Sequence, residues 1–478
     1  LNEPGGGFRN PSPKPSAAAR AVAAKINPFR MALSGARFIG LCIGTESEIL
    51  KKIQAINASA LNIEIINTGS ELMLGYVLNT HQQWLCRQLS ERGYVVSRQT
   101  AVNDTGPDIQ AAVREAMQRA DVIITTGGLG PTSDDRTRDL IAGLLGRSLA
   151  QDAVILARIE AFFGRRKRPV PASTRLQALV PEGAKILQNE YGTAPGLVME
   201  FPRADGTGIL IMLPGPPREL RPMFLEQVLP LIEERFGKSP DFCCTVLRTV
   251  GIGESFVEEQ IAIELGPLMA RGLDVGYCAR VGEVDVRFVA RCAEAAALVR
   301  EAEEIARRRL RTFIYGHDPD ELHATVVQML SERKQTLALA ESCTGGYIAN
   351  RITNVSGASA VFLAGLVTYS NESKERFLGV RAETLVQFGA VSEAVAGEMA
   401  EGARRHTGVD YALAVTGIAG PTGGTPEKPV GTVFIALAHP DGVEVKQQLN
   451  QYDRETFKFL TSQQALDMLR KHLTARSP

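Results

Sequence analysis

The chain has 478 residues, which is enough for two or three domains. Its 53 basic and 53 acidic residues balance, so bulk attraction to nucleic acid is not expected, and no apolar run approaches the roughly 20 residues of a membrane-spanning helix. Seven cysteines without C-x-x-C spacing predict neither a zinc framework nor a disulfide framework and fit a reducing cytoplasm.

Residues 1–58 stand apart from the rest of the chain. Between Pro4 and Thr45 there are six basic residues and no acidic one, and early glycines and prolines oppose a packed core. This composition is typical of a targeting signal. The interpretation that we favour is a disordered extension from a misplaced start codon, with Met31 as an internal start, because the later sequence has a cytoplasmic character.

Strands and helices alternate through residues 61–240. This order predicts a mostly parallel sheet with helices on both faces. Apolar segments predict strands at Leu61–Asn67, Tyr94–Gln99, Asp121–Thr126 and Gly208–Leu213. Amphipathic segments predict helices at Leu78–Arg92, Pro107–Arg119 and Pro222–Phe236.

A glycine-rich loop follows the strand expected at 121–126. Gly127 and Gly128 let backbone N–H groups approach a phosphate without interference from a Cβ atom. Asp134 and Asp135 come next and alone would repel an anion, whereas a divalent metal between carboxylates and phosphate removes that conflict. We therefore expect Asp134 and Asp135 to be metal ligands, with helix capping by one of them as the alternative.

Other glycine and polar residues of this region fall at the carboxyl ends of strands or in the loops beyond. Open α/β sheets bind ligands on that side. The residues expected to line such a pocket are Gly69, Glu71, Gly127, Gly128, Asn189, Gly192 and Pro214.

Two further domains are expected. Residues 243–316 predict a small α+β domain, with a strand at Val284–Ala290 and a charged helix at Glu294–Arg309, and no pattern in it indicates chemistry. Residues 320–478 predict a second α/β domain. Its strands are expected at Thr336–Ala340, Val361–Tyr369, Tyr411–Thr416, Gly431–Ala438 and Val443–Leu449.

The last domain contains a small-residue turn, Glu341–Gly346, between a strand and a helix. Ser359, Tyr369 and Lys374 follow it in one polar stretch. Serine amidohydrolases can use a lysine in place of histidine as the base, provided that burial or a nearby cation keeps the amine neutral. Ser342 is the rival nucleophile, because a strand-to-helix turn also offers N–H groups for an oxyanion.

Several motifs occur in one order along the chain, and together they resemble the CinA family. They are Asn67–Leu72, Thr125–Asp135, Gly192–Gly196, Leu213–Pro217 and Ala340–Gly346. The resemblance covers all but roughly the first 58 residues. It implies a mixed α/β protein: a three-layer domain similar to the molybdopterin-binding fold, a small α+β linking domain, and a C-terminal nicotinamide mononucleotide deamidase domain.

The resemblance also implies roles for residues of the C-terminal domain. Ser359 matches the family's nucleophile, Lys374 its base, and Tyr369 can relay or orient a proton. Arg454 matches an arginine whose guanidinium fork suits the 5′-phosphate of the substrate. The remaining residues expected to bind substrate are Ser342, Thr344, Gly345, Gly346, Thr416 and Gly417. No cofactor is expected for the deamidase.

The function implied is hydrolysis of nicotinamide mononucleotide to nicotinate mononucleotide and ammonia. For the first domain the resemblance implies ADP-ribose pyrophosphatase activity with a divalent metal, although Ala172–Leu176 lacks the asparagines usual in the family after Pro169–Pro171. A cytoplasmic homodimer without nucleic-acid or membrane partners is expected. The alternatives are a molybdopterin-binding protein and a non-enzymatic, competence-related protein.

Overall fold

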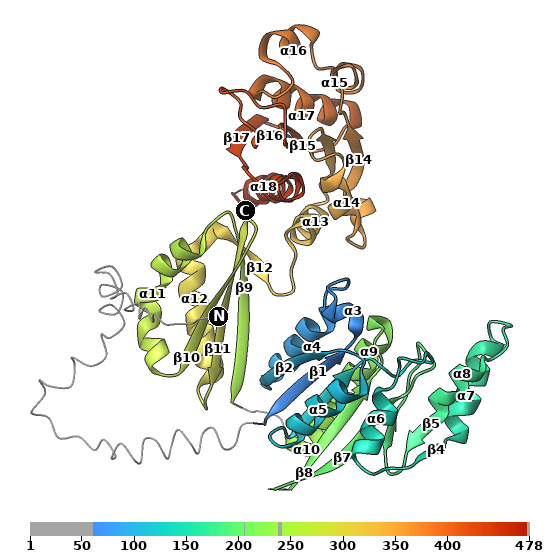
Figure 1. Ribbon diagram of the computed structural model, residues 1–478. Helices are drawn as coiled ribbons and strands as arrows, with labels where there is room; N and C mark the ends of the chain where they lie inside the picture. The colour runs from blue at the N-terminus through green and yellow to red at the C-terminus, as the bar shows by residue number, and fades with distance from the viewer. Residues whose placement is uncertain (1–60, 205, 238–240, 476–478) are drawn as a thin grey trace, which may run out of the picture. The chain divides into compact units, whose positions relative to one another are not determined.

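The computed structural model describes residues 61–204, 206–237 and 241–475 (Figure 1). The extension expected at residues 1–58 lies outside the described residues. The described chain is a mixed α/β protein, as expected, and its main strands form three successive sheets. None of the described helices is both long and apolar enough to cross a membrane.

The first domain contains a six-stranded sheet in the order β2-β1-β3-β8-β7-β6. Its first four strands in this order are parallel, and β7 and β6 run antiparallel to their neighbours. The strands are β1 (Ile63–Thr68), β2 (Val96–Val102), β3 (Val122–Thr126), β6 (Lys185–Leu187), β7 (Gly196–Arg203) and β8 (Gly206–Leu213). Two short strands, β4 (Leu149–Gln151) and β5 (Leu179–Pro181), form a separate ribbon.

Helices cover both faces of this sheet, which explains why its inner strands are apolar at successive positions. Ile65 and Ile124 point to the face covered by α4 and α10, whereas Ile66 and Ile123 point to the face covered by α5 and α6. The helices are α3 (Ser70–Met73), α4 (Thr80–Ser90), α5 (Gly106–Met117), α6 (Thr137–Leu144), α7 (Ala153–Gly164), α8 (Ala172–Arg175), α9 (Pro217–Met223) and α10 (Leu229–Phe236).

The middle domain is a four-stranded antiparallel sheet in the order β10-β11-β9-β12, with α11 and α12 packed together on one apolar face. Its elements are β9 (Phe242–Val250), α11 (Glu254–Ala270), β10 (Leu273–Arg280), β11 (Glu283–Arg291), α12 (Ala295–Leu310) and β12 (Ile314–His317).

The C-terminal domain contains a five-stranded sheet in the order β14-β13-β15-β16-β17. The first three strands in this order are parallel and the last two are antiparallel. The strands are β13 (Leu337–Glu341), β14 (Phe362–Val367), β15 (Tyr411–Gly417), β16 (Thr432–His439) and β17 (Gly442–Leu449). Since β13, β14 and β15 are parallel, the loops after them meet at one edge of the sheet.

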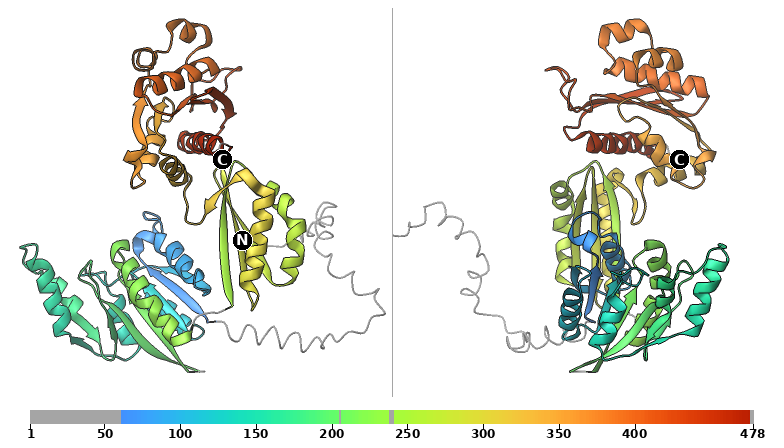
Figure 2. Two further views of the ribbon diagram at one scale, coloured as in Figure 1. Left: turned by 180° about the vertical axis from the view of Figure 1, so that it is seen from behind. Right: turned by 45° about the vertical axis from the view of Figure 1, so that its right-hand side comes forward.

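Three helices cover each face of the C-terminal sheet, and Figure 2 shows α18 and α17 on opposite sides of it. Leucines at alternate positions of the strands face α13 and α18, and alanines face α17. Leu339 and Ala338 of β13 show this division. The helices are α13 (Leu322–Arg333), α14 (Tyr347–Thr353), α15 (Asn371–Leu378), α16 (Ala382–Phe388), α17 (Glu393–Thr407) and α18 (Arg454–Ala475).

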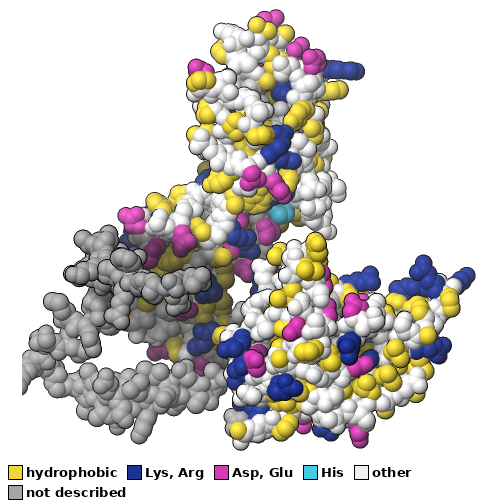
Figure 3. All heavy atoms as spheres, in the orientation of Figure 1, with side chains coloured by type: hydrophobic (Ala, Val, Ile, Leu, Met, Phe, Trp, Pro, Cys, Tyr) yellow, Lys and Arg dark blue, Asp and Glu magenta, His cyan; other side chains and the backbone are white. Residues whose placement is uncertain are grey.

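Acidic and basic side chains are mixed over the visible face of the described chain (Figure 3). One basic run, Arg165–Arg168, follows α7 and is exposed along its whole length. Four exposed residues of one sign are too few to set the sign of the surface, which agrees with the balanced composition.

Candidate functional site

The turn after β13 is organised by the side chain of Glu341. This carboxylate is buried and accepts the N–H groups of Gly346, Ile348 and Ala349 at 3.0, 3.1 and 2.8 Å. The N–H groups at the start of a helix have no partner within it, so the carboxylate accepts the free donors of α14. Its negative charge also interacts favourably with the positive end of the helix dipole. Gly345 and Gly346 have φ of +62° and +92°, in the left-handed region that glycine tolerates.

Ser342 is held on this turn next to a buried lysine. Its N–H donates to the carbonyl of Val415 at 3.0 Å, which ties the turn to β15. The Nζ of Lys374 donates to Ser342 Oγ at 3.1 Å and to the carbonyl oxygens of Thr368 and Tyr369 at 2.8 and 3.4 Å. Only 1% of Lys374 is exposed.

Burial is the main cause that lowers the pKa of Lys374, and a weaker influence of Cys343 raises it. None of the hydrogen bonds described for the Lys374 amine goes to a carboxylate. The amine therefore sheds its proton more readily than an exposed lysine. A neutral amine within hydrogen-bond reach of a hydroxyl can act as its general base.

The structure does not bring Ser359 to Lys374, which corrects the pairing expected from the sequence. Ser359 is exposed in a short 3-10 turn, Ala358–Ala360, that precedes β14. Lys374 follows the opposite end of that strand. Six residues of strand span about 20 Å, so the two residues lie at opposite edges of the sheet. The hydroxyl that meets the amine belongs to Ser342.

Cys343 is packed in the apolar core beneath the same turn. Burial raises the pKa of its thiol to about 12. A thiol that stays protonated is a poor nucleophile. The structure therefore supports a packing role for Cys343.

Tyr369 and Arg454 form the exposed side of the site. Arg454 donates from Nη2 to the Tyr369 hydroxyl at 2.8 Å and from Nη1 to the carbonyl of Gly420 at 2.9 Å. Asp453 caps α18 by accepting the N–H groups of Glu455 and Thr456, each at 3.0 Å, so the Arg454 side chain is not needed for capping. The guanidinium thus joins the loops after β14 and β15.

Two of the other residues expected to bind substrate, Thr416 and Gly417, are used within the fold. The hydroxyl of Thr416 is buried and donates to the carbonyl of Ala390 at 2.8 Å. At Gly417 a Cβ atom would lie 2.8 Å from the carbonyl oxygen of Thr432, so the position requires glycine for close strand packing. Thr344 is buried, and its Oγ1 has no hydrogen-bond partner among the described residues.

The first domain has a cavity of about 610 Å³ at the carboxyl ends of its strands. Among the residues expected there, Gly69, Glu71, Gly127, Gly128 and Pro214 do line it. Its acidic lining residues are Glu71, Asp104, Asp134, Asp135 and Glu219, and none of the described lining residues is Lys or Arg.

The glycine loop can turn sharply at the cavity only because it lacks side chains. Gly127 and Gly128 have φ of +95° and +67°. A Cβ atom at Gly128 would lie 1.9 Å from Thr137 Oγ1, and one at Gly127 would lie 2.8 Å from the carbonyl oxygen of Thr68. The loop therefore lies directly against the end of β1 and the start of α6.

Asn189 and Gly192 do not line this cavity, contrary to expectation. Asn189 Nδ2 donates to Glu219 at 2.7 Å and to the carbonyl of Ala194 at 2.8 Å. A Cβ atom at Gly192 would lie 1.9 Å from Glu219 Oε2. Both residues thus lie against the Glu219 carboxylate, and Glu219 lines the cavity.

The two aspartates expected to bind metal line the cavity but differ in their surroundings. Asp135 accepts hydrogen bonds from the N–H group of Thr132, at 3.0 Å, and from its hydroxyl, which shapes the loop. A hydrogen bond with Thr132 lowers the pKa of the exposed Asp134 carboxyl.

Within the described chain, no three carboxylates of this cavity come close enough to enclose an ion alone. Mg²⁺ commonly uses one or two carboxylates plus water and the phosphates of a ligand. The acidic lining fits such a metal when the ligand brings phosphates.

Sequence patterns missed three residues that matter in these sites. Glu341 ends an apolar strand, and a lone acid in that position before a glycine turn is a usable signal for a buried carboxylate. Glu219 and His81 face the cavity from helices that are distant in sequence, and no local pattern indicates either one.

Three family models together match most of the described chain. The family model for the CinA C-terminal domain matches residues 319–473. The model described as a probable molybdopterin binding domain matches residues 64–234, and that for the damage-inducible protein CinA KH domain matches residues 245–316.

Individual proteins match over most of the chain. A competence-damage inducible protein from Symbiobacterium thermophilum is 44% identical over 425 residues, which cover 86% of this chain and 98% of that protein. A CinA-like protein from Akkermansia muciniphila is 45% identical over 408 residues, covering 85% and 96%. A competence/damage inducible protein of known structure from Agrobacterium tumefaciens is 42% identical and covers 32% of this chain and 93% of its own, with a TM-score of 0.31.

Proposed function

The chain belongs to the CinA family, and from that premise we propose that its C-terminal domain hydrolyses nicotinamide mononucleotide to nicotinate mononucleotide and ammonia. The observation that carries the proposal is the 3.1 Å hydrogen bond between Lys374 Nζ and Ser342 Oγ at a buried amine. A hydroxyl with a neutral lysine as base is the pair required by a serine amidohydrolase that lacks a catalytic histidine.

In the proposed first step, Ser342 Oγ bonds to the carboxamide carbon while Lys374 accepts the hydroxyl proton. The electron pair of the C=O bond moves to oxygen. The N–H groups of Cys343 and Thr344 make no described hydrogen bond to a backbone carbonyl and instead face the sulfur of Cys343. These two groups are our candidates for the oxyanion hole.

In the second step the C–N bond breaks, and Lys374 returns its proton to the departing nitrogen, which leaves as ammonia. The product is an ester of Ser342. Lys374 then accepts a proton from water as the resulting hydroxide attacks the ester, and Ser342 regains a proton as the acid departs. The same amine serves each step because its lowered pKa lets it both accept and release a proton.

The exposed pair of Tyr369 and Arg454 is assigned to substrate binding. Arg454 stands at the first turn of the 22-residue helix α18, where the helix dipole favours an anion. Its guanidinium suits a phosphate, which ammonium groups bind less specifically. Tyr369 lies between this arginine and the carbonyls around Lys374, so its hydroxyl is placed to orient the nucleotide.

For the first domain we propose hydrolysis of ADP-ribose with a divalent metal. The supporting observation is an acid-lined cavity of about 610 Å³ without Lys or Arg among its described lining residues, because such a cavity attracts cations and repels bare phosphates. A bound metal would polarise a phosphoryl oxygen. Asp134 and Asp135 are the proposed ligands, and the loop at Gly127 and Gly128 would bring backbone N–H groups to the phosphate.

One experiment tests the main proposal. The purified full chain is incubated with nicotinamide mononucleotide, and ammonia and nicotinate mononucleotide are quantified. Equal amounts of both products, lost in Ser342→Ala, would support it. Absence of turnover by folded protein would overturn the proposal. A molybdopterin-binding or competence-related role would then be the preferred hypothesis.

A further inference from the structure

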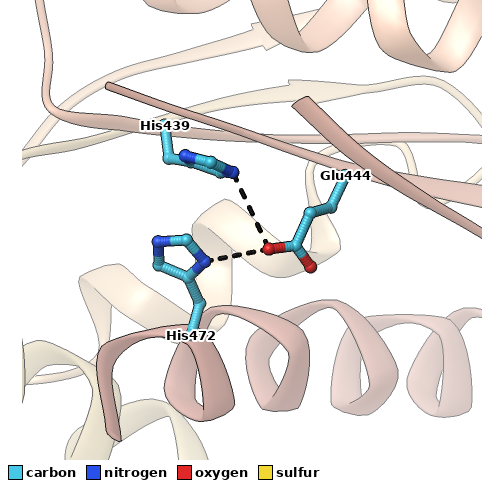
Figure 4. Close-up of side chains that lie close together, drawn as sticks. All are labelled: His439, Glu444 and His472. Atoms are coloured by element: carbon cyan, nitrogen blue, oxygen red, sulfur yellow. Dashed lines mark hydrogen bonds and ion pairs between the residues drawn. The ribbon is translucent and has the colours of Figure 1, made fainter. Parts of the chain in front are cut away.

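Two histidines and a glutamate lie close together in the C-terminal domain, on the last two strands and the last helix described. His439 ends β16, Glu444 lies on β17 and His472 lies near the end of α18 (Figure 4). The two imidazole rings lie one above the other on the same side of the glutamate, with centroids 4.3 Å apart, and each turns a nitrogen toward its carboxylate. Within the described chain this is the one group of three or more possible metal-binding side chains whose ligand atoms all lie within 4.8 Å of one another.

The separations between these ligand atoms suit a small transition-metal ion. Glu444 Oε1 lies 3.1 Å from His472 Nδ1 and 3.7 Å from His439 Nε2. Zinc bonds to histidine nitrogen and carboxylate oxygen are about 2.0–2.2 Å long, so donors of a tetrahedral site are about 3.3 Å apart. The two spacings to Glu444 bracket that value, and the two histidine nitrogens lie within 4.8 Å of each other.

The burial of the three side chains would allow them to hold an ion while water completes its coordination shell. The side chains of His439 and His472 are only 9% and 6% exposed, whereas that of Glu444 is 46% exposed. Two neutral imidazoles and one carboxylate leave a single positive charge from a divalent ion, and the open side at Glu444 gives water access to the fourth position.

We propose that His439, Glu444 and His472 form a zinc-class divalent metal site that fastens the β16–β17 hairpin to α18. The site is distinct from the deamidase residues, because His472 lies 18 residues beyond Arg454 and a helix of that length spans about 27 Å. The ion has a stabilising role and takes no part in amide hydrolysis.

Binding would disrupt hydrogen bonds that the cluster makes without an ion. His472 Nδ1 and Glu444 Oε1 are hydrogen-bonded at 3.1 Å, and a nitrogen that binds metal cannot donate to the carboxylate. A second hydrogen bond is affected at the hairpin turn. His439 Nδ1 accepts the N–H group of Asp441 at 3.2 Å. A neutral imidazole that binds metal through Nε2 carries its proton on Nδ1, so that hydrogen bond must open. The turn at Pro440 and Asp441 is therefore expected to change conformation on metal binding, and the amide resonance of Asp441 should shift.

The test uses the full chain, freed of metal by a chelator and titrated with Zn²⁺, with Co²⁺ as a spectroscopic probe. We expect one Zn²⁺ per chain, a rise in Tm, and a Co²⁺ spectrum typical of tetrahedral nitrogen and oxygen ligands. Glu444→Gln and His472→Gln should each weaken binding at least about 100-fold, since even outer-shell substitutions cost about 10- to 100-fold. Ammonia release per folded molecule should not change.

The matched control is His406→Gln, which removes an exposed histidine of the same domain outside the cluster and should bind like the parent protein. Glu444→Gln alters an exposed strand position and should fold even where His472→Gln does not. Retention of the ion by folded Glu444→Gln would assign it to other ligands, such as the free thiols, and would overturn the proposal. Absence of binding by the parent chain would overturn it equally.

Discussion

At the scale of single residues, the position of the Lys374 amine governs the proposed chemistry. The amine donates hydrogen bonds to a hydroxyl and two carbonyl oxygens. None of these acceptors is a carboxylate that would stabilise the positive charge of the protonated amine. Desolvation then favours the neutral amine. The same residue in an exposed helix would keep its proton at neutral pH.

Removing either member of the pair should abolish deamidation. Ser342→Ala and Lys374→Ala should each lower kcat by at least about 10³-fold, and the double variant should lose little more, because the two act as one unit. Ser359→Ala is the matched control, expected to keep near-native turnover since it lies at the other edge of the sheet. A dead Ser359→Ala enzyme with active Ser342→Ala would reverse the assignment.

The lowered pKa of Lys374 should appear in both catalysis and stability. Between the lowered pKa of the folded state and the ordinary value of about 10.5, the unfolded chain binds more protons, so stability increases as pH rises through that window. The ratio kcat/KM should rise as pH rises through the lowered pKa of folded Lys374 and then reach a plateau. Lys374→Met should therefore be inactive yet raise Tm at pH 7, because it removes a desolvated amine. A lower Tm for this variant would contradict the account.

Arg454 should discriminate between substrates with and without a phosphate. Charge-assisted contacts to phosphate contribute on the order of 1.5–3 kcal/mol, so Arg454→Ala should lower kcat/KM for nicotinamide mononucleotide roughly 10- to 150-fold. The reaction of nicotinamide riboside should change little. Arg454→Lys should recover only part of the loss, because it keeps the charge without the fork. Equal damage to both substrates would give Arg454 a structural role through Tyr369 and Gly420.

At the scale of elements, the strand-to-helix turn is a unit fixed by Glu341. Three N–H groups depend on this carboxylate. Glu341→Ala should leave them unsatisfied and lower the free energy of unfolding by about 3 kcal/mol or more, whereas Glu341→Gln should cost less because it keeps one carbonyl acceptor. Denaturant unfolding measures both values. Glu455→Ala, an exposed change, is the control, and a small loss in Glu341→Ala would show that water replaces the carboxylate.

Local patterns identified the parallel strands and several long helices, but they missed β7, β10, α7 and α11 and did not show which residues meet in space. Apolar runs such as 122–126 and 411–416 were placed correctly because strands covered on both faces are apolar throughout. Ser359 and Lys374 looked like neighbours since only 14 residues separate them, but β14 lies between and carries them apart. Short β4, β5 and β6 and the whole of α11 were not anticipated, because three-residue strands and a helix with apolar residues on all sides lack a clear period.

At the scale of the whole molecule, the cavity of the first domain shows where sequence reasoning stops. Its acids come from positions as distant as Glu71 and Glu219, so only the folded sheet collects them. The glycine loop was recognisable because its conformation requires glycine locally. Asn189 and Gly192 were predicted to line the cavity because they belong to or flank a family motif. In the structure they lie against the Glu219 carboxylate and do not line the cavity.

The two proposed activities should be separable within one chain, since their residues lie in different domains. Asp134→Asn should lower the rate of metal-dependent ADP-ribose hydrolysis at least about 10²-fold, because it removes a proposed metal ligand. Ammonia release should not change, because Asp134 is exposed and holds no described helix or strand in place. Ser342→Ala should do the reverse. Asp139→Asn is the control, as that residue pairs with Arg138 outside the cavity lining.

A chelator provides the independent arm of this test. It should suppress ADP-ribose hydrolysis by the parent chain while ammonia release continues, and added Mg²⁺ or Mn²⁺ should restore the first activity. Equal ADP-ribose turnover with and without the chelator would remove the metal from the proposal. A parent chain without any ADP-ribose turnover would instead make the acidic cavity a binding site, since Asp134 and the glycine loop would still hold a metal–phosphate ligand without the water geometry that hydrolysis needs.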